Sequence, residues 1–164
     1  MKRNQPQFKF FLDANCVNAR QQNPTLNELE NFRAKGFVTL VFTEATHREA
    51  GIGKQERTDK AAGFTYTKFE PFCDGNEHTK LAIESILFPA GAKTDNHRND
   101  VLAVYHAERL RWPLVTMDGA SKKQPGGILG RAAELATLGI EVISPECALA
   151  RVRAACSGAA QLKR

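Results

Sequence analysis

The chain has 164 residues, of which 42% are hydrophobic and 25% are charged, and its formal net charge is +5. This length suits one domain with a substantial core, and the composition is that of an ordinary globular protein. No apolar run approaches the ~20 residues that cross a bilayer, and the basic start lacks the apolar core and cut site of a secretion signal. We therefore expect a cytoplasmic protein, and the mild basic excess is compatible with a nucleic-acid partner.

The first predicted elements are a strand, a helix and a second strand. The apolar run FKFFL, residues 8–12, is typical of a buried strand and stops on Asp13. NPTLNELENFRAKG, residues 23–36, predicts a helix with a proline in its first turn and a glycine at its end. FVTLVF, residues 37–42, is β-branched and aromatic, which predicts another buried strand. Thr43 follows it as a suitable cap for a short helix through EATHREA.

The middle of the chain contains a region without a clear pattern, followed by two helices. Residues 51–75 are charged, and FTYTKF, residues 64–69, alternates like a strand but is equally compatible with an irregular excursion. NEHTKLAIESILF, residues 76–88, predicts a helix that a proline and a glycine end. RNDVLAVYHAERLRW, residues 98–112, predicts a second helix, which a proline stops.

The last third of the chain continues the alternation of strands and helices. LVTM, residues 114–117, predicts a strand that again stops on an aspartate, and GGILGRAAELATLG, residues 126–139, predicts a helix. IEVIS, residues 140–144, predicts a strand, and PECALARVRAAC, residues 145–156, predicts the final helix. The tail, residues 157–164, is expected to fray.

Strands that alternate with helices predict an α/β fold, in which a central parallel sheet lies between two layers of helices. We expect a single domain over residues 1–164, with its core at about residues 8–146. Parallel strands run the same way, so their carboxyl ends share the edge of the sheet where open α/β folds place ligand sites. The sequence requires no organic cofactor, and its four cysteines, none in a C-x-x-C pair, are expected to be reduced.

Two of the predicted strands stop on a carboxylate, Asp13 and Asp118. If those strands are neighbours, their backbones lie about 4.8 Å apart, and two carboxylates so close repel unless a cation lies between them. Hard oxygen ligands of this kind favour Mg²⁺ or Mn²⁺. An aspartate that follows a strand is also a common turn residue or helix cap, so each of the two alone would carry little weight.

Two further acids are expected near the same edge. Asp100 is predicted in the first turn of the helix before the Asp118 strand, where an acid also suits the helix dipole. Glu49 is predicted on the short helix after residues 37–42. Glu44 lies five residues before Glu49, about 140° away around a helix, so only one of the two can face the site.

Four segments stand out, which are FLDANCV, TEATHREAGIG, NDVLAVYHAERLRWPLVTMD and GIEVISP. They resemble segments of the PIN domain family of metal-dependent ribonucleases, which includes the VapC toxins of toxin–antitoxin pairs. FLDANCV resembles the opening LLDTNVL of that family, and TEATHREAGIG resembles its S-x-x-x-x-x-E-x-x-x-G segment. NDVLAVYHAERLRWPLVTMD resembles ADALIAATALEHGLPLVTRD, with its two acids 18 residues apart. The resemblance covers roughly residues 10–145, although the segment 51–93 carries no match.

The resemblance implies a Mg²⁺- or Mn²⁺-dependent endoribonuclease with a PIN-like fold. One or two metal ions would lie among four acids, which are Asp13, Glu49, Asp100 and Asp118. Asn15 and Thr116 would support them. The expected partners are RNA and, for a toxin, an antitoxin protein, and a homodimer is compatible with the family.

Other residues near the predicted edge have plainer alternatives. Asp95 could replace an acid that the family often carries after its last aspartate, although a loop aspartate is commonly a turn residue. Four basic side chains are candidates for contacts with RNA phosphates, or else belong to solvated loops: His97, Arg98, Lys122 and Lys123.

Two alternative functions remain open at this point. The chain could be a PIN-like module that binds RNA without cutting it, because GASKK follows Asp118 where the family often has another acid. It could also be an unrelated doubly wound domain that binds phosphate or acts in signalling. Receiver-type domains need a lysine at the end of the last strand, and IEVISP has none.

Overall fold

The computed structural model describes the backbone of residues 8–19, 22–43, 46, 67–69, 77–119 and 126–161. Within these ranges five strands form one sheet in the order β3-β2-β1-β4-β5, and every pairing is parallel. The strands are β1 (Phe8–Leu12), β2 (Val38–Thr43), β3 (Thr67–Phe69), β4 (Leu114–Val115) and β5 (Val142–Ile143). The predicted parallel sheet is confirmed, and β3 is the end of the alternating segment at residues 64–69.

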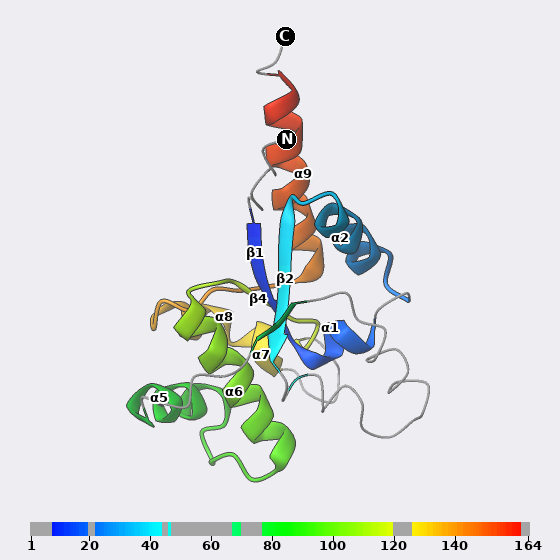
Figure 1. Ribbon diagram of the computed structural model, residues 1–164. Coiled ribbons are helices and arrows are strands. Elements are labelled where there is room, and N and C mark those ends of the chain that lie inside the picture. Colours follow the sequence, from blue (N-terminus) through cyan, green and yellow to red (C-terminus); the bar gives the residue numbers. More distant parts are fainter. Residues whose placement is uncertain are drawn as a thin grey trace.

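Helices cover both faces of this sheet, which confirms the predicted three-layer architecture (Figure 1). One layer contains α1 (Ala14–Asn18), α2 (Pro24–Ala34) and α9 (Pro145–Gln161). The other layer contains α5 (Glu77–Leu87), α6 (Asp95–Leu110), α7 (Gly127–Gly130) and α8 (Ala132–Ala136). Among the described residues, no helix is long and apolar enough to cross a membrane.

The two layers are separated because side chains alternate along each strand. In β1, Phe10 and Leu12 pack against the layer of α2 and α9, whereas Phe11 packs against the layer of α5 and α6. β4 divides its two residues in the same way, with Val115 on the first face and Leu114 on the second. This period of two explains why the strands read as continuous apolar runs, since both faces are buried.

The strand order changes direction between β1 and β4, because the chain moves from β1 to β2 and β3 on one side and to β4 and β5 on the other. Such a point leaves a crevice outside the carboxyl ends of the two strands. Asp13 follows β1 directly, and Asp118 lies three residues after β4. The topology therefore brings both predicted acids to the place where this class of fold binds ligands.

The helix predicted at residues 23–36 is confirmed as α2. Asn23 caps it, because its Oδ1 atom accepts hydrogen bonds from the amides of Thr25 and Leu26 at 2.9 and 3.2 Å. Gly36 follows the helix with a φ of 80°, a left-handed conformation that glycine adopts without strain. The Thr43 Oγ1 atom accepts a hydrogen bond from the Thr46 amide at 3.1 Å, as a cap would, but the helix predicted through EATHREA lies outside the described residues apart from Thr46.

The helix that carries Asp100 begins earlier than predicted. It starts at Asp95 and not at Arg98, because the Thr94 Oγ1 atom accepts a hydrogen bond from the His97 amide at 3.2 Å and caps the helix there. Asp100 therefore lies in the second turn of α6, and the expectation that it occupies the first turn was wrong. A role for Asp100 in satisfying the helix dipole is weakened accordingly, since that effect falls off within the first turn.

Three other boundaries differ from the prediction. The segment at 126–139 forms two short helices, α7 and α8, that meet at Arg131, because glycines at both ends of α7 weaken a continuous helix. The strand at 114–117 is regular over two residues only, although the Thr116 amide still donates to the Ile143 carbonyl at 3.1 Å. α9 continues to Gln161, into the tail expected to fray, because extending a helix that is already packed costs little.

His106 is a buried polar residue in the middle of α6, and only 4% of its surface is exposed. Its ring contacts the rings of Phe11 and Tyr105. In the described part of the chain, no hydrogen-bond partner faces its Nδ1 atom. Burial, with a smaller contribution from the charge of Lys80, lowers the pKa of His106 from 6.5 to about 4. The folded protein therefore holds this imidazole neutral.

We expect His106 to make folding sensitive to acid. The unfolded chain binds a proton at this residue near pH 6.5, whereas the folded chain does so only near pH 4. Stability should therefore fall as the pH decreases through this window, by at most about 1.4 kcal/mol per pH unit from this residue. Urea unfolding of the wild type and His106→Phe at pH 7, 5.5 and 4.5 measures the difference. A wild type and variant with the same pH dependence would contradict the expectation.

Candidate metal-binding and active site

Asp13 and Asp118 follow adjacent strands, as predicted. β1 and β4 are paired in register, with Leu12 opposite Val115, and the Asp13 amide donates to the Val115 carbonyl at 3.1 Å. Asp13 is buried, with 5% of its surface exposed, and Asp118 is half-buried. Burial raises the pKa of Asp13 most, and the nearby charge of Asp118 adds to this effect.

Both oxygens of the Asp13 carboxylate accept hydrogen bonds. Oδ1 accepts from the Ala14 amide at 2.7 Å, so Asp13 caps the short helix α1. Oδ2 accepts from the Thr116 hydroxyl at 2.7 Å. The carboxylate is thus held in one orientation by β1, by the start of α1 and by the segment after β4.

The Thr116 hydroxyl is the centre of this network and is fully buried. Its oxygen accepts hydrogen bonds from the Asn15 side-chain amide at 3.2 Å and from the Asp118 backbone amide at 3.0 Å. These two donors use both lone pairs of the oxygen, so its own hydrogen points to Asp13. A single hydroxyl thereby connects the two aspartates.

Asn15 completes the connection from the other strand. Its Nδ2 atom donates to Thr116, and its Oδ1 atom accepts from the Met117 amide at 3.0 Å. The side-chain amide therefore fixes the segment of residues 116–118 relative to the start of α1. Asn15 and Thr116, which were predicted to support a metal site, thus hold Asp13 and residues 116–118 in place, and their role toward a metal stays a prediction.

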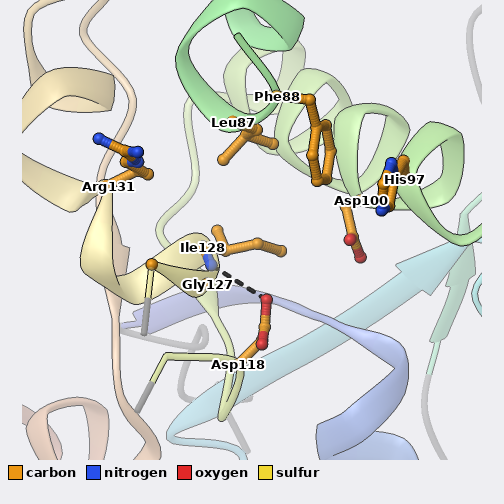
Figure 2. Close-up of a pocket in the computed structure, with 9 residues that line it drawn as sticks. Leu87, Phe88, His97, Asp100, Asp118, Gly127, Ile128 and Arg131 are labelled. Carbon is orange, nitrogen blue, oxygen red and sulfur yellow. Dashed lines mark hydrogen bonds between the residues drawn. The ribbon is translucent and has the colours of Figure 1, made fainter. Parts of the chain in front are cut away.

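Asp118 is positioned by α7, a contribution that the sequence analysis missed. Its Oδ2 atom accepts from the Ile128 amide at 3.0 Å, and its carbonyl accepts from the Leu129 amide at 2.8 Å (Figure 2). The close approach requires glycines, because a Cβ at Gly119 would lie 2.2 Å from Leu129 Cβ, and one at Gly127 would lie 2.7 Å from Gly119 Cα. The GG pair at the start of GGILGR is the sequence signal for this contact.

Two hollows adjoin these acids. We call the first the acidic hollow, which has a volume of about 280 Å³ and is lined by Asp13, Ala14, Asn15, Asn18, Thr94, Asn96, His97, Asp100 and Asp118. We call the second the apolar hollow, which has a volume of about 260 Å³ and is lined by Leu87, Phe88, His97, Asp100, Asp118, Gly126, Gly127, Ile128 and Arg131 (Figure 2). Asp100 and Asp118 border both.

The electrostatics of the site favour a cation. Burial raises the pKa of Asp13 most strongly, the nearby charge of Asp118 raises it further, and the hydrogen bonds from Thr116 and Ala14 oppose both effects. A bound cation would reverse the unfavourable contributions. The donors are carboxylate and amide oxygens, which fit Mg²⁺ or Mn²⁺ better than softer metals.

The described residues do not form a complete metal site by themselves. Within the described ranges, no group of three or more His, Cys, Asp or Glu side chains is arranged to hold a metal ion. Asp13 and Asp118 are neighbours, and Asp100 faces the same hollow from α6. The predicted fourth acid, Glu49, lies outside the described residues, as does its alternative Glu44.

The structure brings some of the remaining predicted residues to the site and separates others. His97 lines both hollows. Asp95 is exposed, forms an ion pair with Arg98 at 2.6 Å and lines neither hollow. The acids that line the hollows from α6 and from the segment after β4 are Asp100 and Asp118. The predicted RNA contacts Lys122 and Lys123 lie outside the described residues.

Comparison with known proteins identifies the fold. No family model matches the sequence, and no curated protein matches it. The fold is similar to that of a chain in the crystal structure of VapBC2 from Rickettsia felis bound to a DNA fragment from their promoter. The TM-score is 0.53, the sequence identity is 17%, and the match covers 84% of this chain and 98% of that chain. At this identity the likeness shows a shared, PIN-like α/β fold and nothing further.

We expect Thr116 to be required for the stability of this site. Thr116→Val keeps the shape of the side chain but leaves a buried Asp13 oxygen and the Asn15 amide without their partner, at a cost of about 1–3 kcal/mol for a buried group. Thr116→Ser keeps the hydroxyl and serves as the control. Urea unfolding at pH 7 measures both variants. Equal stability of the Thr116→Val and Thr116→Ser proteins would show that the network contributes little.

Proposed function

We propose that the chain is a metal-dependent nuclease that hydrolyses phosphodiester bonds in RNA. The observation that carries this proposal is the placement of Asp13 and Asp118 after the ends of two adjacent parallel strands, with Asp100 facing the same hollow. Three acids at one hollow have no evident structural task in common, whereas metal-dependent phosphoryl transfer needs carboxylates at such a place. The PIN-like fold and the sequence resemblance to PIN ribonucleases support the same class of reaction.

In this proposal each residue of the network has a separate task. Asp13, Asp100 and Asp118 hold a divalent ion together with Glu49. When bound, such an ion activates a water molecule and stabilises charge on the phosphodiester. Thr116 and Asn15 keep the Asp13 carboxylate and the residues before Asp118 in fixed orientations, and the Ile128 amide does so for the Asp118 side chain. This orientation lowers the reorganisation that the reaction requires.

We further propose that the nuclease is the toxin of a toxin–antitoxin pair. The support is the similarity of the fold to that of one chain in the VapBC2 structure. The match covers 98% of that chain. An antitoxin would then restrain the activity in the cell, and a short neighbouring reading frame with a DNA-binding motif would strengthen this part of the proposal.

A module that binds RNA without cutting it is the second candidate. It is favoured by the absence, within the described ranges, of a group of three side chains arranged for a metal ion. The burial of Asp13 adds to this, since both of its oxygens already accept hydrogen bonds. The two candidates differ in whether the protein cuts RNA, and a divalent ion bound to the acids is a condition for cutting.

We expect Mn²⁺ to raise the melting temperature of the wild-type protein. An ion that binds only the folded state stabilises it by mass action, by about 2.7 kcal/mol at a concentration 100 times its dissociation constant. Asp118→Asn should lose most of this response. Asp95→Asn is the matched control, because that acid lies near the site but pairs with Arg98 outside the acidic hollow. The melting temperature of each protein is compared between zero and about 10 mM Mn²⁺, a range that covers the dissociation constant of a weak site.

The metal site would be refuted by a wild type whose melting temperature is independent of Mn²⁺. A response that Asp95→Asn removes and Asp118→Asn retains would also contradict the assignment, because the ion would then bind at the start of α6 and not between the strands.

We expect the purified protein to cleave single-stranded RNA in Mn²⁺ or Mg²⁺ and to stop when EDTA is added. Asp100→Asn should abolish cleavage while the fold is kept, since the side chain is half-buried at the surface of α6 and asparagine has the same shape. Glu108→Gln is the matched control, an acid of the same helix that borders a hollow at its far end. Cleavage is measured on a panel of structured and unstructured RNAs.

Equal cleavage by the wild type and by Asp100→Asn would mean that the activity comes from another site or from a contaminating nuclease. Failure of the wild type over the whole panel, with metal binding established by the melting experiment, would favour the module that does not cut RNA.

A further inference from the structure

The apolar hollow is bordered by Asp100 and Asp118, but apolar side chains form much of its remaining wall. Leu87 and Phe88, from the end of α5 and the residue after it, form one side, and Ile128 of α7 forms another. Figure 2 shows the carboxylates of Asp100 and Asp118 directed toward this opening from different walls. The hollow therefore joins an apolar surface to the place where the proposed reaction would occur.

A stacked pair of rings forms the wall between α5 and α6. The rings of Phe88 and His97 are nearly parallel, at 11°, with their centroids 4.1 Å apart. The His97 ring is fixed further, because its Nδ1 atom accepts a hydrogen bond from the Lys93 amide at 3.3 Å. The backbone amide of His97 is held in turn by Thr94. An aromatic surface that is already ordered loses little conformational freedom when a planar ligand stacks on it.

The charges and the size of the hollow restrict its occupant. Asp100 and Asp118 repel a phosphate or carboxylate group that enters without a cation. A volume of about 260 Å³ is below the roughly 300–1,000 Å³ of pockets for drug-sized ligands, so the hollow suits a small ring system and not a whole chain segment. An uncharged, planar ring with a polar edge meets both conditions.

Polar groups are available for the edge of such a ring. Arg131 lines the hollow and is anchored by an ion pair of its Nη1 atom with Glu134 at 3.1 Å. The two carboxylates of the hollow, Asp100 and Asp118, accept hydrogen bonds from amino groups at the edge of a ring. Aromatic stacking combined with a few polar groups is how proteins hold unpaired bases of RNA.

We infer that the apolar hollow binds one nucleobase of the RNA, stacked against the Phe88–His97 pair, beside the bond to be cut. The inference rests on the proposed function and deepens it, because it assigns a base-binding site to residues outside the acidic network. The acidic hollow then receives the backbone of the RNA and the apolar hollow receives an adjoining base. Phe88 and His97 would determine which nucleotide flanks the cleavage position.

Free ribonucleosides in EDTA test the base site without cleavage and without a metal. They are uncharged, so Asp100 and Asp118 do not repel them. At least one of the four should bind saturably to the wild type, as measured by NMR titration. Phe88→Ala and His97→Ala should weaken that binding by roughly 5- to 150-fold, the range expected for the loss of one stacking partner. Phe88→Tyr, which keeps the ring, should bind as the wild type does.

Leu81→Ala is the control for both variants, because Leu81 is an apolar side chain of the same helix, α5, that is 62% exposed and does not line the hollow. Circular dichroism establishes that each protein is folded, and His97→Ala, at the half-buried start of α6, carries the test if Phe88→Ala does not fold. The inference is overturned if no nucleoside binds the folded wild type. It is also overturned if Phe88→Ala and His97→Ala bind like Leu81→Ala, or if a nucleoside monophosphate binds more tightly than its nucleoside in EDTA.

The outcomes separate this inference from the proposed function. RNA cleavage by a wild type that binds no nucleoside would remove the base site and leave the nuclease. Nucleoside binding by a wild type that does not cleave RNA would leave the base site and remove the nuclease. If the wild type both cleaves RNA and binds a nucleoside, His97→Ala should lose the preference for one nucleotide at the cleavage position.

Discussion

The hydroxyl of Thr116 connects the two strands on which the proposed site depends. It gives its hydrogen to Asp13 and receives hydrogens from Asn15 and from the backbone of Asp118. Because both lone pairs and the hydrogen are used, the three partners cannot move independently without leaving a buried polar group unpaired. The network therefore links the ends of two neighbouring strands through one buried group.

This edge carries an electrostatic cost that the rest of the fold offsets. Burial and the charge of Asp118 both raise the pKa of Asp13, so the ionised carboxylate is unfavourable there without a cation. The two apolar layers of the core, packed on opposite faces of the same strands, supply the stability that allows it. Carboxylates with a perturbed pKa occur at functional sites and also in structural networks, and Asp13 has a structural task as the cap of α1. The glycines at 119 and 127 serve the same edge, because they let α7 approach Asp118 closely enough for its amides to reach the carboxylate and the carbonyl.

The stacked rings of Phe88 and His97 place an aromatic surface beside the acids. Phe88 and His97 come from the end of α5 and the start of α6, and α6 also carries Asp100. A single helix start thus orders an aromatic surface and an acid three residues apart in sequence. α5 and α6 pack on each other and on the same face of the sheet, so the aromatic surface and the acidic edge keep a constant relation. Recognition of a base and cleavage of the adjoining bond would then be coupled by rigid packing and would need no moving segment.

The sequence by itself determined the alternation of strands and helices, the parallel sheet and the edge at which Asp13 and Asp118 meet. These follow from local rules, namely apolar runs that end on polar residues and the single direction of parallel strands. The resemblance to the PIN family also indicated Asn15 and Thr116 as supporting residues. The local pattern misplaced the start of α6, because Thr94 and Arg98 are both acceptable near a helix start and only the hydrogen bond to the His97 amide selects Thr94. Only the tertiary structure decided that α7 holds Asp118 and that Phe88 stacks on His97. Each of these contacts joins separate elements or selects one side-chain direction among several, and local sequence patterns do not encode such choices.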